Sequence, residues 1–258
     1  MYKFDPQNRI TSNLAVLRQA GFKRQRYFGT QNQTVSPCLR ALLPFINKIE
    51  NGVYIDGGCG DAPEVFYMAK RGWRSFGIDC FSPTHTETLE HYKNTGGSFV
   101  EADISEAWVE FWDKKIKTEK CDAITLNAMI DLIPESQWVS VFYEVYECLE
   151  YGVGIGYFAV NFVDLKSAGV NTATKKEDLL RAVEEVCFPL VGISKIGGVV
   201  IACSEYTEES LKFFKSQTTY FSIAYWCPRC ELQFRQSSSR FTHPNHCHYC
   251  GSSEIGPI

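Results

Sequence analysis

Residues 53–71, VYIDGGCGDAPEVFYMAKR, decide the fold class of this chain. The first four residues, Val53–Asp56, predict a short buried strand, and the glycines of Gly57–Gly60 predict a tight turn directly after it. From Ala62 to Arg71 the apolar residues recur at helical spacing. A strand, a glycine-rich turn and a helix in this order expose backbone N–H groups and a helix N-terminus at one point. The unit therefore predicts the ligand-binding edge of a parallel sheet.

Strands and helices alternate on both sides of this unit. Ser36 and Pro37 are typical of a helix start. Beyond the unit, the predicted strands are 75–79, 98–103, 121–127 and 154–163, and the predicted helices are 84–96, 106–117, 135–152 and 175–186. Two β-rich runs within 189–205, separated by Gly197 and Gly198, predict a terminal hairpin.

This alternation predicts an α/β fold. Strands connected through helices run parallel in one sheet, and the helices cover both of its faces. We therefore expect a doubly wound, mostly parallel seven-stranded sheet that closes with an antiparallel hairpin. The expected division of the chain is a helical and loop extension at 1–35, the main domain at 36–206, a connector at 207–220 and a small module at 221–258.

The composition is that of an ordinary globular protein, with 45% hydrophobic and 22% charged residues. A formal net charge of -4 gives no general affinity for nucleic acid, although a local basic surface is compatible with it. The first residues lack an apolar leader segment, and no run approaches the roughly 18 apolar residues of a membrane span. We therefore expect a soluble, cytoplasmic protein without a membrane partner.

The eleven cysteines fall into two classes. Seven are single and lie mostly in apolar segments, where a free cysteine acts as a small hydrophobic residue. The other four form two CxxC pairs separated by 16 residues, a spacing that resembles a zinc ribbon. Two such pairs supply the four thiolates of a tetrahedral site, so we predict one structural Zn²⁺ held by Cys227, Cys230, Cys247 and Cys250.

The stretch Asp56-Gly57-Gly58-Cys59-Gly60 resembles the D-x-G-x-G motif of the class I, Rossmann-like methyltransferases, whose methyl donor is S-adenosylmethionine. The resemblance covers residues 35–206 and implies a donor site at the carboxyl ends of the parallel strands. In that family Asp79 would bind the ribose hydroxyls, Asp103 the adenine amino group, and Asn127 the methionine moiety or the transferred methyl. The full set of implied donor-binding residues is Asp56, Gly57, Gly58, Gly60, Asp79, Cys80, Asp103, Ile104 and Asn127.

A dinucleotide site is the main rival for this glycine turn. Its G-x-G-x-x-G fingerprint requires a small residue at the sixth position, but counting from Gly58 places Pro63 there. Asp56 before the turn suits the ammonium of a methionine tail and would repel a pyrophosphate. These residues favour S-adenosylmethionine over a dinucleotide.

The methyl acceptor is less well defined by the sequence. Methyl transfer is an in-line displacement at a sulfonium, so the protein chiefly has to align donor and acceptor. Residues 127–130, NAMI, lack the Pro-Pro-aromatic run of enzymes that methylate amino groups in nucleic acids. No catalytic residue is identified. Asp131 is a candidate general base, and capping or solvation would explain this residue equally well.

Three functions stay open. The first is a methyltransferase whose zinc ribbon presents a macromolecular acceptor, RNA or protein, through aromatic side chains and Arg229, Arg235 and Arg240. The second is a small-molecule methyltransferase with the ribbon as a lid or dimer contact. The third is a non-catalytic regulatory protein that keeps a nucleotide-binding site. We favour the first function, in which the ribbon governs the choice of acceptor and leaves donor binding unaffected.

Overall fold

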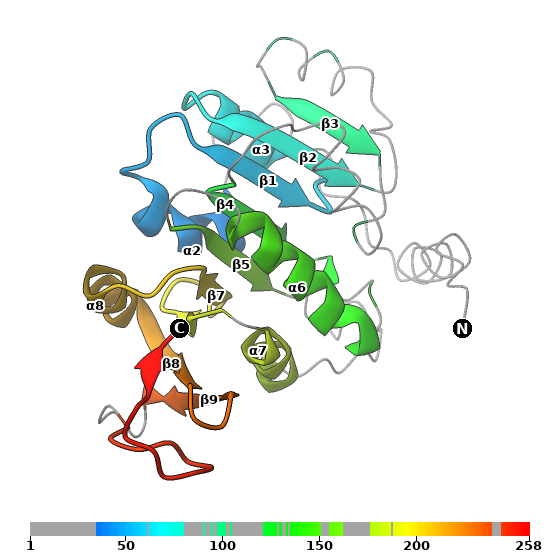
Figure 1. Cartoon of the computed structure of the whole chain (residues 1–258). Coiled ribbons are helices and arrows are strands. Elements are labelled where there is room, and N and C mark those ends of the chain that lie inside the picture. The colour runs from blue at the N-terminus through cyan, green and yellow to red at the C-terminus, as the bar shows by residue number, and fades with distance from the viewer. Residues whose placement is uncertain are drawn as a thin grey trace.

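The computed structural model describes residues 35–60, 62–79, 90, 94, 97–101, 104, 121–127, 129–130, 133, 135–150, 155–161, 176–186, 188–238 and 244–258. Within them, one ten-stranded sheet has helices on both faces (Figure 1). The strands are β1 (Val53–Gly57), β2 (Arg74–Asp79), β3 (Ser98–Glu101), β4 (Ala123–Asn127), β5 (Tyr157–Asn161), β6 (Leu190–Ser194), β7 (Val200–Cys203), β8 (Thr218–Cys227), β9 (Leu232–Ser237) and β10 (Gly256–Pro257). The helices are α2 (Pro37–Ile46), α3 (Pro63–Ala69), α6 (Glu135–Glu150), α7 (Lys176–Glu185) and α8 (Glu208–Gln217).

One half of the sheet is parallel, in the order β3-β2-β1-β4-β5. All residues of β1 are buried, and their side chains alternate between the two faces. Val53 and Ile55 join the core beneath α6 and α7, whereas Tyr54 joins the core beneath α2 and α8. This half confirms the predicted α/β arrangement of mostly parallel strands, with β1 at the centre and all carboxyl ends at one edge.

The other half is antiparallel and longer than predicted. β7 pairs with β5, and β6 pairs with β7, with Gly197 and Gly198 at positive φ between them. β8 then pairs with β6, and both β9 and β10 pair with β8. The expected count of seven strands is therefore too low, because the C-terminal residues add to the same sheet.

The predicted connector at 207–220 is part of the main fold. Thr207 caps α8, because its Oγ1 accepts a hydrogen bond from Ser210 N at 2.9 Å while Thr207 N donates to Ser210 Oγ at 2.8 Å. The helix buries Leu211 and Phe214 against the sheet. The helix therefore extends the core beyond residue 206.

The predicted module boundary at residue 221 falls inside β8. Two polar residues of this strand, Thr218 and Ser222, are buried. Thr218 Oγ1 donates to Phe214 O at 2.8 Å, and Ser222 Oγ donates to Glu184 Oε1 at 2.5 Å. Because these hydroxyls are satisfied inside the fold, a stretch with polar residues serves as a core strand.

The single cysteines behave as small hydrophobic residues wherever the structure describes them. Cys38, Cys59, Cys121, Cys148 and Cys203 are buried thiols. Cys80 and Cys187 lie outside the described residues. Of the helices described, none has the length and apolar character to cross a membrane.

Candidate functional site

The glycine turn joins β1 to α3 at the carboxyl edge of the parallel strands. Gly57 has no room for a side chain, because a Cβ there would lie 2.2 Å from Ile104 Cδ1. Gly58 and Gly60 have φ values of 69° and 54°, in the left-handed region that favours glycine. The N–H of Gly58 donates to Ile78 O at 2.7 Å, which holds the turn against the end of β2. The turn therefore requires glycine at the predicted positions.

Asp79, the last residue of β2, lies beside this turn. Its Oδ2 accepts a hydrogen bond from Gly60 N at 2.9 Å. The residue is only partly buried, so its carboxylate stands at the surface of the sheet edge. The fold thus brings together the glycine turn and the carboxylate that the sequence predicts to bind ribose.

Asp56 lies beneath the turn, where it is almost fully buried. Its Oδ1 accepts a hydrogen bond from Thr125 Oγ1 at 3.0 Å, and Thr125 Oγ1 is 2.6 Å from Tyr54 Oη. Burial, then repulsion by the carboxylates of Glu64 and Asp79, raise the pKa of Asp56 well above its usual range, against the hydrogen bond from Thr125. Asp56 therefore binds a proton more readily than an exposed aspartate does.

Glu64, the second residue of α3, is a buried carboxylate that sequence reasoning missed. Its Oε1 accepts a hydrogen bond from Ser36 N at 2.9 Å, where α2 begins. Burial raises the pKa of Glu64, although the hydrogen bonds from Ser36 oppose this shift. The available signal was its position, because an acidic residue in the first turn of the helix after a glycine turn lies close to any bound ligand.

The end of β4 completes this edge. Asn127 Oδ1 is buried and has no hydrogen-bond partner among the described residues. A buried amide oxygen without a partner is costly, so it marks a position where a ligand N–H or O–H can bind. Met129 covers the turn, because a Cβ at Gly58 would lie 2.6 Å from Met129 Cβ. Ile104 is buried against Gly57.

Three predicted site residues lie outside the described residues. They are Cys80 and Asp103 of the implied donor site and Asp131, the candidate base. The glycines, Asp79, Ile104 and Asn127 gather at one edge, and Asp56 lies directly below it.

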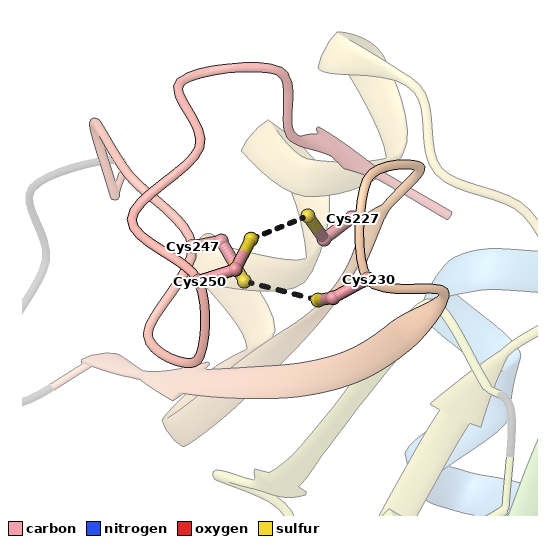
Figure 2. A group of neighbouring side chains, drawn as sticks. All are labelled: Cys227, Cys230, Cys247 and Cys250. Carbon is pink, nitrogen blue, oxygen red and sulfur yellow. Dashed lines mark hydrogen bonds between the residues drawn. The ribbon is translucent and has the colours of Figure 1, made fainter.

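The two CxxC pairs come together after β8 and before β10 (Figure 2). All four sulfurs lie within 4.8 Å of one another, and the pairs Cys227–Cys250 and Cys230–Cys247 are each 3.6 Å apart. Tetrahedral zinc with Zn–S bonds of about 2.3 Å places its sulfurs about 3.8 Å apart. The cluster therefore has the size of a four-thiolate zinc site.

Both pairs have the same backbone construction. The N–H of Glu231 donates to Cys227 O at 2.9 Å, and the N–H of Gly251 donates to Cys247 O at 3.0 Å. Glu231 and Gly251 each follow the second cysteine of a pair and have φ values of 55° and 70°. The N–H of Tyr249 also donates to Cys247 Sγ at 3.4 Å. A donor aimed at sulfur stabilises a thiolate, so the turn at Cys247 favours an ionised cysteine.

Two thiols of the cluster, those of Cys247 and Cys230, have pKa values shifted in opposite directions. Desolvation opposes ionisation of Cys247, but N–H groups of Cys250 and Tyr249 and the neighbouring thiols lower its pKa to about 6. Desolvation and the neighbouring cysteines raise the pKa of Cys230 to about 12. Closely spaced thiolates repel one another, so a positive ion between the sulfurs favours their ionised forms.

The cysteine cluster lies far from the glycine turn. β6, β7, β5 and β4 separate β8 from β1 in the sheet, which makes five steps or about 24 Å. β8 also runs opposite to β1, because β7, β6 and β8 alternate in direction from β5. Ile223 of β8 pairs with Leu190, the first residue of β6. β8 continues for four residues beyond this pair and ends at Cys227. The cluster therefore lies toward the opposite edge of the sheet (Figure 1).

Arg235 was expected on a surface for nucleic acid, but it is bound inside the fold. Its Nε donates to Glu184 O at 2.6 Å, and its Nη2 donates to Val186 O at 3.0 Å and to Phe188 O. These carbonyls lie at the end of α7 and just beyond it, so the guanidinium caps that helix and ties β9 to it. Arg229 is exposed.

No protein-family model and no curated protein matches this chain. Among solved structures, it is similar to the 1,6-didemethyltoxoflavin-N1-methyltransferase of Burkholderia thailandensis, with 12% identity, a TM-score of 0.51, and coverage of 81% of this chain and 93% of that chain. The chain shares the fold of S-adenosylmethionine-dependent methyltransferases.

Two further similar structures are methyltransferases. The magnesium protoporphyrin IX methyltransferase of Synechocystis PCC 6803 has 13% identity, a TM-score of 0.49, and coverage of 79% of this chain and 98% of that chain. A TehB-like methyltransferase from Corynebacterium glutamicum has 15% identity, a TM-score of 0.46, and coverage of 77% and 98%. At such identities the likeness concerns the fold alone.

Proposed function

We propose that this chain is an S-adenosylmethionine-dependent methyltransferase whose donor site is the edge formed by the glycine turn. The carboxylates of Asp56, Glu64 and Asp79 around this turn are the observation that carries the proposal. Among the described residues, neither Asp56 nor Glu64 contacts a basic side chain. Such a site attracts a donor with a sulfonium and an ammonium group, and repels the pyrophosphate of a dinucleotide.

Each residue of the edge has a proposed role toward the donor. The turn glycines let the donor approach the backbone, and Asp79 accepts hydrogen bonds from the ribose hydroxyls. Asn127 Oδ1, which lacks a partner among the described residues, accepts a hydrogen bond from the donor's ammonium or from the acceptor. Asp103 would bind the adenine amino group, as the motif resemblance implies, and Cys80 and Ile104 are proposed as further donor-binding residues.

Methyl transfer mainly requires that the donor's methyl group and the acceptor are aligned. The acceptor's lone pair attacks the methyl carbon, the carbon–sulfur bond breaks, and its electron pair stays on sulfur. Holding the two reactants in line supplies much of the rate acceleration, because the encounter no longer depends on diffusion. Asp131 stays a candidate base for acceptors that must lose a proton.

We propose a small molecule as the acceptor, in place of the RNA or protein favoured by the sequence. The macromolecular hypothesis required the cysteine module to present the acceptor near the donor. The described part of that module lies toward the other edge of the sheet, and Arg235 is engaged with backbone carbonyls. The similar structure from Burkholderia thailandensis, which contains its small-molecule substrate and S-adenosylhomocysteine, also supports this choice.

We further propose that the cysteine cluster binds one structural Zn²⁺. The sulfur spacing and the N–H donors around Cys247 support this assignment. Four thiolates fill the coordination sphere of zinc, so the ion would have no open position for a substrate. Its proposed task is to fix the end of β8 to the segment that leads into β10.

Methyl transfer from labelled S-adenosylmethionine tests this function. The protein is incubated with a cell extract, which is then separated into metabolites, RNA and protein. We expect label in the metabolite fraction. Label in RNA or protein would instead support a macromolecular acceptor, and binding of S-adenosylhomocysteine without any transfer would support a regulatory protein.

A matched pair of glycine variants shows whether this turn is responsible. Gly58→Ala should abolish transfer, because the new Cβ would lie 2.6 Å from Met129 Cβ at a φ of 69°. Gly72→Ala is the control, since Gly72 also has a positive φ, of 85°, but nothing lies within 4 Å of a Cβ there. The control carries similar backbone strain and should retain transfer. Equal losses in the two variants would argue against the assigned site.

A further inference from the structure

Asp56 and Glu64 are two buried carboxylates that repel each other. Both carboxylates lie behind the glycine turn, one at the end of β1 and one in the first turn of α3. Asp56 is 2% exposed and Glu64 is 6% exposed. Asp56 is held by Thr125, and Glu64 is held by Ser36 at the start of α2. Two carboxylates in such surroundings repel each other and share protons.

The described groups that act on this pair are acidic or neutral. Asp79 faces it from β2 and adds a negative charge. Cys38 of α2 and Tyr54 of β1 are fully buried, and the pKa of each is raised well above its usual value by burial and then by Asp56 and Glu64. Both are therefore neutral near pH 7, so the pair has no positive partner among the described residues.

S-Adenosylmethionine and its product differ by one charge at the sulfur. The donor carries a sulfonium, an ammonium and a carboxylate, which sum to +1. After transfer the sulfur is a neutral thioether, and S-adenosylhomocysteine has a net charge of 0. A site with buried carboxylates distinguishes the two ligands even where their contacts are the same.

We propose that Glu64 is a positioning residue that, through Asp56, makes the donor site prefer the cationic donor to its neutral product, with release of a proton as the donor binds. This inference rests on the proposed function. The incoming cation stabilises the ionised form of both carboxylates, so the proton they share leaves to solvent. When the sulfonium charge is lost on transfer, the pair regains its affinity for a proton.

The direction of the pH dependence follows from this linkage. A ligand that binds the ionised pair more tightly gains affinity as pH rises, by up to tenfold per pH unit for one proton. Binding of S-adenosylmethionine should therefore strengthen as the pH rises. Binding of S-adenosylhomocysteine should change much less, because it offers no added positive charge.

Titration calorimetry of the intact, zinc-loaded protein tests the inference. Each ligand is titrated at pH 7 in phosphate and in Tris, whose different ionisation heats reveal the number of protons released. We expect release with S-adenosylmethionine and almost none with S-adenosylhomocysteine. Equal proton counts for the two ligands would overturn the inference, and this measurement needs no variant. If neither ligand binds, the proposed function itself has failed.

Glu64→Gln is the informative variant, since a glutamine oxygen can still accept the hydrogen bond from Ser36 N. We expect the affinity for S-adenosylmethionine to fall about fivefold, that for S-adenosylhomocysteine to change less than twofold, and the proton release to disappear. Glu177→Gln is the matched control, because Glu177 is also the second residue of a helix but is exposed. A parallel loss of both affinities in Glu64→Gln would mean that Glu64 is only structural.

Discussion

The glycine turn after β1 and the cysteine turns near the end of β8 have similar backbone conformations but different functions. Both depend on residues in the left-handed region, Gly58 in the first and Glu231 and Gly251 in the second. At the glycine turn the polar groups are left open, since Asn127 Oδ1 has no described partner. At the cysteine turns, four sulfurs face one another. The first arrangement suits an exchangeable ligand, and the second suits a resident ion.

Their separation in the sheet gives this difference its functional meaning. The two regions lie five strand steps apart and toward opposite edges. We therefore expect that substitutions in the cysteine cluster lower stability and leave donor affinity unchanged. Substitutions at the glycine turn should lower donor affinity and leave the stability of the C-terminal residues unchanged.

The largest expected effect is the loss of zinc. Cys247→Ser removes one of four thiolates, and about 10 kcal/mol of metal-binding free energy is coupled to the folding of such small sites. Hydrogen exchange should show residues 227–238 and 244–258 losing protection, while β1 and β4 stay protected. Metal analysis should fall from one zinc per chain to nearly none.

Cys148→Ala is the control for this variant, because Cys148 is buried in α6 and lies outside the cluster. It should retain its zinc and the protection of the C-terminal residues. Full zinc content in Cys247→Ser would contradict the assigned ligands. Loss of protection throughout β1 and β4 would contradict the separation of the two ends.

A smaller loss of stability is expected for Arg235→Ala. The change leaves the carbonyls of Glu184, Val186 and Phe188 without their charged donor, which should destabilise the protein by about 2–4 kcal/mol. Denaturant unfolding measures this loss. Arg229→Ala, at an exposed position, should stay within about 0.5 kcal/mol of the wild type. Equal stabilities of the two variants would show that Arg235 does not tie β9 to α7.

Asp79, beside the glycine turn, should affect donor affinity without affecting zinc binding. Asp79→Ala should weaken S-adenosylhomocysteine binding by about 1–3 kcal/mol, because the ribose hydroxyls would lose their acceptor. Titration calorimetry gives this value directly, and the zinc content should not change. Asp178→Ala, on the half-exposed surface of α7, serves as the control. An unaltered affinity in Asp79→Ala would remove Asp79 from the site.

Local patterns were sufficient to predict the parallel half of the sheet and the cysteine cluster. The strand-turn-helix unit at 53–71 and the two CxxC pairs each lie within a short stretch, so their structure depends on neighbouring residues. The turn glycines and Asp79 were placed for the same reason, since strand ends meet at one edge of a parallel sheet.

The errors came from contacts between distant segments. β8 belongs to the sheet through pairing with β6, and its Ser222 is satisfied by Glu184, 38 residues away. Glu64 is buried because Ser36 reaches it from the start of another helix. Arg235 binds backbone carbonyls at the end of α7 and not a ligand, because β9 lies beside that helix. None of these contacts leaves a periodic signal in the sequence.

The central claim is that the glycine edge is built for a cationic adenosyl donor. Its most direct test is calorimetric titration of the zinc-loaded wild-type protein with S-adenosylmethionine and, separately, with NAD. We expect one saturable site per chain for S-adenosylmethionine and no measurable binding of NAD, because the carboxylates repel a pyrophosphate. Tighter binding of NAD than of S-adenosylmethionine would contradict the claim.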